Sequence, residues 1–277
     1  MESQQEPRAE HLVVAAVYRR EVAASLTRIW ENVLDWEHLP WLHARSFVGI
    51  ELERASADGF RARVSLPPAA APRAATLEVR LDRPGLRYLT ETVDGLGAGT
   101  RIWTRLEPVA ERRTRIAVEF HLPGALAGSD EQARAIGAFY LRLYTQLWDE
   151  DEAMMVRRQA VLDARPIRSA ARARLSLGPV AALRPRLPLI VEAAGEHFRV
   201  VDLAGALLAH TVVCPHLGGP LEAATPGPDG SLTCPWHGYR FDLRTGRSCD
   251  GRGLVLRCAP RIEVDAGGEA ALVWSAA

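Results

Sequence analysis

Hydrophobic and polar positions alternate along the first half of the chain with two different periods. Residues 11–22 have the β-branched, alternating character of a strand. Residues 25–41 instead repeat apolar residues at helical intervals, which predicts an amphipathic helical stretch. Its apolar face carries Leu26, Ile29, Trp30, Val33 and Leu34.

Six shorter runs with strand-like alternation follow, and turn signals such as Asp58-Gly59 and Pro84-Gly85 separate them. Tight turns between short strands indicate an antiparallel sheet. The predicted strands lie within residues 46–54, 59–66, 75–82, 86–93, 100–108 and 114–122.

A long amphipathic helix is predicted after the last of these strands. Ser129, with Gln132 three residues later, has the pattern of a capping box, which marks a helix start. From about Asp130 to Ala164, apolar residues recur at helical intervals. They are Ile136, Phe139, Tyr140, Leu143, Leu147, Met154 and Met155.

One strand, a helical pair, six antiparallel strands and a long helix together describe an α+β helix-grip domain over residues 11–164. This order resembles the START-like (SRPBCC) superfamily of polyketide cyclases, lipid-transfer domains and Rieske oxygenase catalytic domains. The resemblance implies a sheet that curls around the last helix and leaves an apolar cavity. Either cavity lining or core packing is the expected role of Phe47, Trp103, Phe120, Tyr140 and Tyr144.

Residues 165–187 differ from what precedes them, because they are rich in arginine and contain no acid. The simplest interpretation is an exposed linker, and the alternative is a docking strip for an acidic redox partner. Its arginines are Arg165, Arg168, Arg172, Arg174, Arg184 and Arg186. Short alternating strands and glycine turns then return, and they predict a second, all-β domain over residues 188–277.

Composition narrows the function classes. The chain has 277 residues, of which 48% are hydrophobic and 25% charged, as in a globular protein with room for two domains. With 34 basic and 34 acidic residues the net charge is zero, so we expect neither nucleic acid nor an anionic membrane as partner. Every basic residue is arginine, which excludes lysine Schiff-base chemistry and a P-loop.

The expected location is the cytoplasm. No apolar run approaches the roughly 20 residues that span a bilayer. The first eleven residues are polar and lack the pattern of a signal peptide.

Two motifs in the second domain, Cys214-x-His216 and Cys234-x-x-His237, combine cysteine with histidine. One ligand of each kind per loop suits a two-iron cluster, with thiolates on one iron and neutral imidazoles on the other. Tetrahedral zinc would also accept two cysteines and two histidines. Classical zinc fingers, however, place the two cysteines close together in sequence and the two histidines close together, unlike this chain. Cys249 and Cys258 lie outside the motifs, and we expect both to be buried small residues without a role in metal binding.

With its flanking residues, CPHLGGPL followed by CPWHGYRFDLRTG, this pair of motifs resembles the Rieske [2Fe–2S] motif. The resemblance implies that Cys214 and Cys234 bind one iron and that His216 and His237 bind the other. Respiratory Rieske proteins carry an additional cysteine in each loop, which this chain lacks. The domain is therefore similar to the ferredoxin or oxygenase type.

A second group of polar residues lies in the first domain, with the spacing Asn32-x-x-Asp35-x-x-His38-x-x-x-x-His43. Pro40 is expected to break the helix between the two histidines, which would bring both imidazoles to one point. Two histidines and one carboxylate on one face of Fe(II) leave positions open for O2 and substrate.

The carboxylate must come from elsewhere, and residues 149–152 of the long helix are Asp-Glu-Asp-Glu. An acid that faces an apolar cavity needs a metal or another partner, because an isolated buried charge is costly. We expect Asp149 and Glu152 to be solvated, which leaves one inward-facing acid.

The spacing in residues 32–43 resembles the iron-binding stretch of Rieske non-haem iron oxygenases, and Glu150-Asp151 followed by Gln159 resembles their C-terminal helix. The resemblance implies that His38, His43 and Asp151 bind a mononuclear Fe(II), with Glu150 as the second choice of carboxylate. Asp35 would be the carboxylate that passes the electron from a cluster histidine to an iron-site histidine.

The implied function is a Rieske-type oxygenase that hydroxylates, dihydroxylates or demethylates a small apolar or aromatic substrate with O2. Two features depart from that family: the domain order is reversed, and the first domain is compact. A separate ferredoxin or flavin reductase would donate electrons at His216 and His237, and the family's usual assembly implies a homotrimer. The alternatives are a non-enzymatic ligand-binding domain fused to a Rieske ferredoxin, as electron carrier or redox sensor, and an inactive supporting subunit. The substrate, the donor and the outcome of the reaction stay open.

Overall fold

The computed structural model describes residues 11–71, 73–164, 174–193, 195–257 and 260–274. The chain divides into two compact units, Met1–Val156 and Arg157–Ala277, and the boundary falls inside the longest helix, α4 (Asp130–Asp163).

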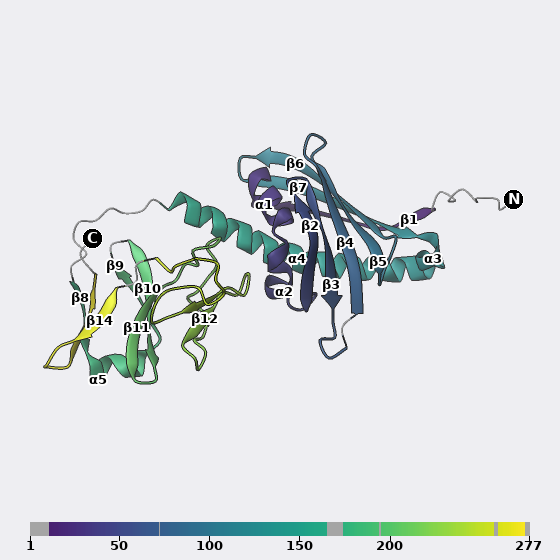
Figure 1. Cartoon of the computed structure of the whole chain (residues 1–277). Coiled ribbons are helices and arrows are strands. Elements are labelled where there is room, and N and C mark those ends of the chain that lie inside the picture. Colours follow the sequence, from purple (N-terminus) through teal and green to yellow (C-terminus); the bar gives the residue numbers. More distant parts are fainter. Residues whose placement is uncertain (1–10, 72, 165–173, 194, 258–259, 275–277) are drawn as a thin grey trace. The chain divides into compact units, whose positions relative to one another are not determined.

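The first unit is built on a seven-stranded antiparallel sheet in the order β1-β7-β6-β5-β4-β3-β2 (Figure 1). The strands are β1 Leu12–Val22, β2 Gly49–Ser56, β3 Gly59–Leu66, β4 Arg73–Asp82, β5 Arg87–Gly95, β6 Arg101–Ala110 and β7 Arg113–Pro123. All neighbours but β1 and β7 are consecutive in sequence, so six of the strands follow one another directly along the chain, and β1 forms the edge beside β7.

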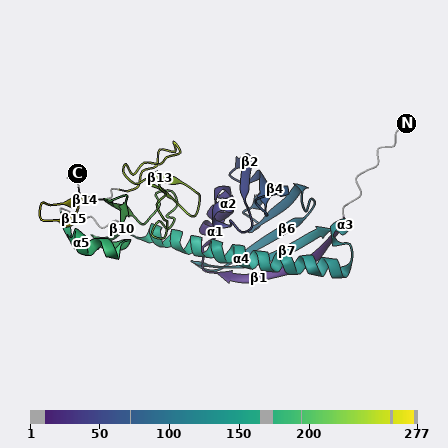
Figure 2. The same cartoon turned by 90° about the horizontal axis from the view of Figure 1, so that it is seen from below.

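Helix α4 runs lengthwise along this sheet (Figure 2). Three short helices accompany it: α1 Leu26–Leu34, α2 Leu39–Leu42 and α3 Gly124–Ala127. This is a helix-grip-like arrangement, so the predicted α+β fold of the first domain is confirmed. The N-terminus of α4 begins as expected, since the Ser129 hydroxyl accepts a hydrogen bond from the Gln132 N–H. No helix in the described part of the chain is long and apolar enough to cross a membrane.

The contact between α4 and the sheet is close because of one glycine. A Cβ atom on Gly137 would lie 2.4 Å from the Ala15 carbonyl oxygen of β1. Further along the helix, Phe120 of β7 lies between two tyrosines, stacked on Tyr140 at a centroid distance of 4.9 Å and edge-on to Tyr144 at 4.8 Å. The aromatic contacts and the missing side chain together set the distance between helix and sheet.

The predicted helical stretch over residues 25–41 is interrupted earlier than expected. Helix α1 ends at Leu34, and Asp35 leaves helical geometry with φ −84° and ψ 72°. A 3₁₀ turn, Trp36–His38, follows, and Pro40 then stands in the first turn of α2. Proline is tolerated there because its missing N–H has no partner in a first helical turn. The expectation that Pro40 breaks the helix was therefore wrong, and the break lies at Asp35.

In its described residues, the second unit contains three small antiparallel sheets, β11-β10-β9, β12-β13 and β14-β15-β8. The strands are β8 Arg174–Pro179, β9 Leu189–Ala193, β10 Glu196–Leu203, β11 Ala206–Thr211, β12 Ser231–Thr233, β13 Arg240–Asp242, β14 Arg261–Val264 and β15 Glu269–Val273. Between β8 and β9 lie helix α5 (Val180–Leu183) and a 3₁₀ turn, Arg184–Arg186. Val200, Ala209 and Leu272 form a core shared by two of the sheets.

Residues 174–186 of the arginine-rich segment predicted as a linker form regular structure. β8 pairs with β15, so residues 174–179 are a strand of the second unit. Arg174 forms an ion pair with Glu263, and Arg184 contacts Asp202 and the Gly205 carbonyl. Arg165, Arg168 and Arg172 lie outside the described residues.

Replacing Gly137 with alanine should destabilise the first unit by about 1–3 kcal/mol, because the new methyl group would collide with the backbone of β1. Helix propensity alone predicts the opposite sign, since alanine is favoured over glycine by about 1 kcal/mol. Chemical denaturation measures the difference. Ala135→Gly, at an exposed position of the same helix, is the control and reports propensity alone. A stabilised Gly137→Ala variant would contradict the close contact.

Candidate metal sites and the cavity of the first unit

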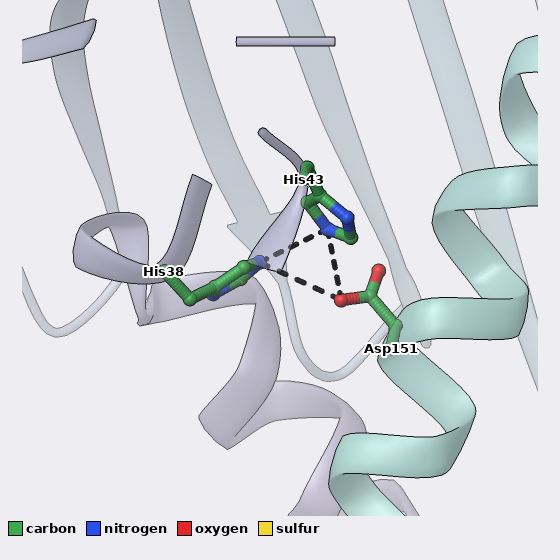
Figure 3. Close-up of side chains that lie close together, drawn as sticks. All are labelled: His38, His43 and Asp151. Atoms are coloured by element: carbon green, nitrogen blue, oxygen red, sulfur yellow. Dashed lines mark hydrogen bonds and ion pairs between the residues drawn. The ribbon is translucent and has the colours of Figure 1, made fainter. Parts of the chain in front are cut away.

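His38, His43 and Asp151 converge on one point in the first unit (Figure 3). The two Nε2 atoms lie 3.2 Å apart, His43 Nε2 lies 3.1 Å from Asp151 Oδ1, and His38 Nε2 lies 3.5 Å from the same oxygen. The imidazoles come from either end of α2 and the carboxylate comes from α4. Both histidines are buried, with exposed fractions of 4% and 1%.

These separations fit one small cation. Nitrogen and oxygen ligands lie about 2.0–2.2 Å from a first-row metal, so two ligands at right angles are about 3 Å apart. All three edges of the triangle formed by His38, His43 and Asp151 are near that value. Two imidazoles and one carboxylate on one side of a metal are the donor set of non-haem Fe(II) sites. The residues therefore fit a mononuclear iron.

A further set of contacts orients the ligands. The other ring nitrogen of His43, Nδ1, lies 2.6 Å from Glu150 Oε2, and the Gln146 amide donates to Glu150 Oε1 at 3.1 Å. The Asn32 amide donates to Asp151 Oδ1 at 3.0 Å. A carboxylate at Nδ1 fixes the tautomer in which the Nε2 lone pair points toward a metal.

Glu150, the second choice of ligand, thus contacts Nδ1 of His43, on the side of the ring away from His38. Asp151 contacts Nε2, the ring nitrogen that faces His38. Sequence reasoning missed the orienting roles of Gln146 and Asn32. The spacing Gln146 to Glu150, one helical turn, was the available signal.

Charge within the cluster is balanced by mutual contacts. Burial alone would lower the pKa of His43, but hydrogen bonds and Coulomb attraction from Asp151 and Glu150 outweigh it and raise that pKa. Burial raises the pKa of Asp151, and contacts with His43, His38 and Asn32 reverse the shift and lower it. A proton on His43 and a metal ion would both neutralise the same carboxylates, so they compete for this position.

The other two acids of residues 149–152 point elsewhere. Asp149 and Glu152 both pair with Arg20 of β1, and Glu152 also accepts the Ala23 N–H at 2.7 Å. Asp149 is solvent-exposed as expected, whereas Glu152 is mostly covered. Asp35 lies on the opposite side of His38, with its Oδ2 3.6 Å from His38 Nδ1.

An apolar cavity of about 570 Å³ lies between the sheet and α4, and His38, His43, Asp35 and Asp151 line it. Of the residues expected in its wall, Phe47, Tyr140 and Tyr144 are there.

Two other residues expected in the wall are not. Trp103 lies on the opposite face of β6 from the cavity-lining Ile102, because neighbouring strand residues point to opposite faces, and Arg87 stacks on its ring. Phe120 is fully buried beneath the tyrosines and packs in the core.

Two equivalent loops carry the cysteine–histidine motifs of the second unit. In the first, the Gly218 N–H donates to the Cys214 carbonyl at 3.0 Å, and in the second, the Gly238 N–H donates to the Cys234 carbonyl at 2.9 Å. Both glycines have positive φ, 86° and 68°, a conformation that glycine adopts without strain. Arg157 supports the first loop by donating to the Gly218 carbonyl.

The ligand atoms of the two loops face one another. The Cys214 and Cys234 thiols hydrogen-bond, which lowers the pKa of Cys234 and raises that of Cys214. The His216 and His237 rings lie 4.5 Å apart, centroid to centroid. A Cβ on Gly219 would lie 2.6 Å from the Cys234 sulfur, so a glycine is required there. Two sulfurs and two imidazoles in this arrangement fit a [2Fe–2S] cluster with mixed ligands.

A stack of side chains covers one of the cluster histidines. The Tyr239 ring stacks on His216 at 4.5 Å and 29°, and the Arg252 guanidinium lies 4.1 Å above the Tyr239 ring. Arg252 also donates to the Tyr239 hydroxyl at 2.8 Å. Sequence reasoning did not find this stack, because Arg252 is separated from both motifs.

The second unit also contains the two cysteines outside the motifs, Cys249 and Cys258. Cys249 is exposed, so the interpretation of it as a buried small residue was wrong. It lies in a turn region after β13, where the backbone pairs but the side chain faces outward. Cys258 lies outside the described residues.

Residues 174–255 match the family model of the Rieske [2Fe–2S] domain. This match confirms the Rieske domain, in second position along the chain, and supports a [2Fe–2S] cluster and a role in electron transfer. The matched segment begins at β8.

Several solved structures are similar to one part of the chain. The Zhui aromatase/cyclase from Streptomyces sp. R1128 is 15% identical, covers 56% of this chain and all of its own, and has a TM-score of 0.46. A START superfamily protein from Mycobacterium smegmatis is 19% identical over 52% of this chain and 99% of its own, with a TM-score of 0.39. The ferredoxin of carbazole 1,9a-dioxygenase from Nocardioides aromaticivorans IC177 is 23% identical over 37% of this chain and 99% of its own, at a TM-score of 0.32. None of the curated proteins compared with the chain matches it.

Glu150→Gln should weaken Fe(II) binding at the first-unit site by about 10–100-fold, because the amide no longer fixes the His43 tautomer as a carboxylate does. Anaerobic titration calorimetry with Fe(II) measures the affinity. The control is Asp149→Asn, at the neighbouring exposed acid that pairs with Arg20. Equal affinities in Glu150→Gln and wild type would contradict the orienting role.

Arg252→Gln should lower the reduction potential of the cluster, since it removes a positive charge stacked over the Tyr239–His216 pair. A potentiometric titration followed by visible circular dichroism measures the shift. Arg261→Gln, an exposed arginine of β14, serves as the control. A potential that stays at the wild-type value in Arg252→Gln would show that the stack does not tune the cluster.

Proposed function

We propose that the chain is a Rieske-type oxygenase, in which a [2Fe–2S] cluster supplies electrons to a mononuclear non-haem Fe(II) in the first unit. The observation that carries the proposal is the triangle of His38, His43 and Asp151 on the wall of an apolar cavity. The presence of a Rieske domain in the same chain supports it, because O2 activation at such an iron needs a source of single electrons.

The proposed ligands are His38 Nε2, His43 Nε2 and Asp151 Oδ1. Fe(II) held there supplies O2 activation. Glu150 holds the proton on His43 Nδ1, so that Nε2 remains a ligand, and the Asn32 amide holds Asp151 Oδ1. The apolar cavity wall excludes water from the reacting face and receives an apolar or aromatic substrate. Hydroxylation, dihydroxylation and demethylation are all compatible with this arrangement.

Asp35 is proposed to pass electrons toward the iron site through His38, its neighbour at 3.6 Å. In the second unit, His216 and His237 are the proposed exit ligands of the cluster, which a separate ferredoxin or flavin reductase would reduce. A homotrimer, in which the cluster of one chain serves the iron of the next, follows from the oxygenase resemblance.

A second candidate function is a non-enzymatic ligand-binding domain joined to a Rieske electron carrier. It is favoured by the hydrogen bonds that join His43 to His38, Asp151 and Glu150, since such bonds are what buried polar side chains of a cavity wall require. In that case the histidines are buried polar residues of the cavity wall, and only the cluster contains iron.

Iron and acid-labile sulfide content separates the two functions. Anaerobically purified protein should contain about three irons and two sulfides per chain, since a [2Fe–2S] cluster accounts for two of each. His38→Ala/His43→Ala should lose one iron and keep the visible spectrum of the cluster. His121→Ala/His197→Ala, with two histidines outside both sites, is the matched control and should keep all three.

Two irons in wild type and in both variants, after reconstitution with Fe(II) as well, would exclude the oxygenase. The chain would then be a ligand-binding domain with an electron carrier.

A further inference from the structure

The cavity of the first unit is elongated, and its two ends differ. Phe139 and Asp151 of α4 both line it and are twelve residues apart, which is about 18 Å along an α-helix at 1.5 Å per residue. At the Asp151 end the neighbouring His38 and His43 are buried. At the other end, Phe139 is 52% exposed. The cavity therefore has a deep end at the candidate iron site and an entrance about 18 Å away.

The entrance is formed by loops that the sheet register brings together. Leu66 of β3 pairs with Arg73 of β4, and Ala75 pairs with Gly95 of β5, so the β3–β4 and β5–β6 connections lie at one end of the sheet. Leu96, in the second of these connections, lines the cavity and is 48% exposed. Exposed apolar side chains around an opening are typical of a ligand entrance.

Arg73 lines the cavity at this entrance and is the single arginine among the described residues of the cavity wall. The guanidinium contacts the Pro67 carbonyl at 3.3 Å and has no carboxylate partner among the residues that the structure describes. Two other arginines of the sheet, Arg80 and Arg101, both pair with Glu91. Arg63 of β3 has no such pair among the described residues, but it does not line the cavity. Arg73 is therefore a cation that the fold leaves available to a ligand.

The acids of the cavity lie at the opposite end. Asp35 and Asp151 line the deep end, and together they would balance the two positive charges of a bound Fe(II). An anionic group consequently gains more from Arg73 than from the deep end. Charge thus orients a bound molecule, with its anion outward and its neutral part toward His38 and His43.

We propose that the ligand of this cavity is an elongated, mainly aromatic or aliphatic monoanion whose acidic head group binds Arg73 while its neutral end reaches the candidate iron site. The inference deepens the proposed function by naming a substrate class, but binding itself needs no iron. A volume of about 570 Å³ lies within the range of sites that enclose ligands of this size. Tyr140, near the entrance, and Tyr144, between the two ends, both line the cavity and provide the aromatic surface for the body of the ligand.

The test uses 11-(dansylamino)undecanoic acid and its methyl ester, which share one body and differ in the charge of the head group. Fluorescence titration of the full-length protein should give a Kd for the acid that rises about tenfold in Arg73→Gln, the loss expected for one charge-assisted contact. The Kd for the ester should stay within about twofold of wild type. Arg63→Gln is the control, since Arg63 is exposed on β3 and does not line the cavity.

Three further measurements test whether binding is specific to the cavity and to Arg73. Leu143→Trp, which fills the cavity from α4, should weaken the binding of both probes. Dansylglycine carries the same charge and fluorophore on a short body, and it should bind more weakly than the long acid because it cannot span the cavity. Repeating the titrations with His38→Ala/His43→Ala separates the inference from the iron: the dependence on Arg73 should persist without it.

Equal changes for the acid and the ester in Arg73→Gln, or no change for either, would overturn the assignment of the anion site. Binding of the long acid that survives Leu143→Trp would also overturn it, because the probe would then lie outside the cavity.

Discussion

The approach of α4 to the sheet at Gly137 determines the arrangement of everything else in the first unit. Once the helix backbone lies against Ala15 of β1, its rotation about its own axis is set. Residues that follow at intervals of three or four must then face the sheet. They are Tyr140, Tyr144, Trp148, Asp151 and Met155, of which four are core side chains and one is an acid. Asp151 is therefore held inside by the same periodicity that buries the aromatic residues.

An acid in that position requires partners, and the fold supplies them from a different part of the chain. The break at Asp35 turns the backbone out of α1, so that a 3₁₀ turn and α2 present His38 and His43 to the helix. Removing one member of such a buried set leaves the others unsatisfied, at a cost of about 1–3 kcal/mol for a neutral group and more for a charge. The mutual contacts therefore hold these side chains in their observed arrangement.

The sequence predicts the helices and strands that have a strong periodic pattern. It predicts less well those features whose conformation depends on tertiary contacts. The strands and α4 follow from alternating or helical patterns, and the motif residues of the Rieske loops follow from their spacing. The position of the helix break could not be predicted from the sequence. Pro40 is compatible with a first helical turn, and Asp35 carries no local signal for ending a helix. The contacts of Arg252 with Tyr239, and of Glu150 with His43, join residues whose proximity no periodicity encodes.

The two ends of the cavity depend on different parts of the fold, and this separation has a functional consequence. The candidate ligands lie where α4 meets α2, whereas Arg73 is the first residue of β4 and Leu96 lies on the β5–β6 connection. Strand ends and connections tolerate substitution, because few buried contacts depend on them. The candidate metal end is instead constrained by mutual hydrogen bonds. Changes at the entrance can thus alter which molecule enters and how deeply it reaches, while the geometry around His38, His43 and Asp151 stays the same. Selectivity and chemistry would then be adjusted independently within one domain.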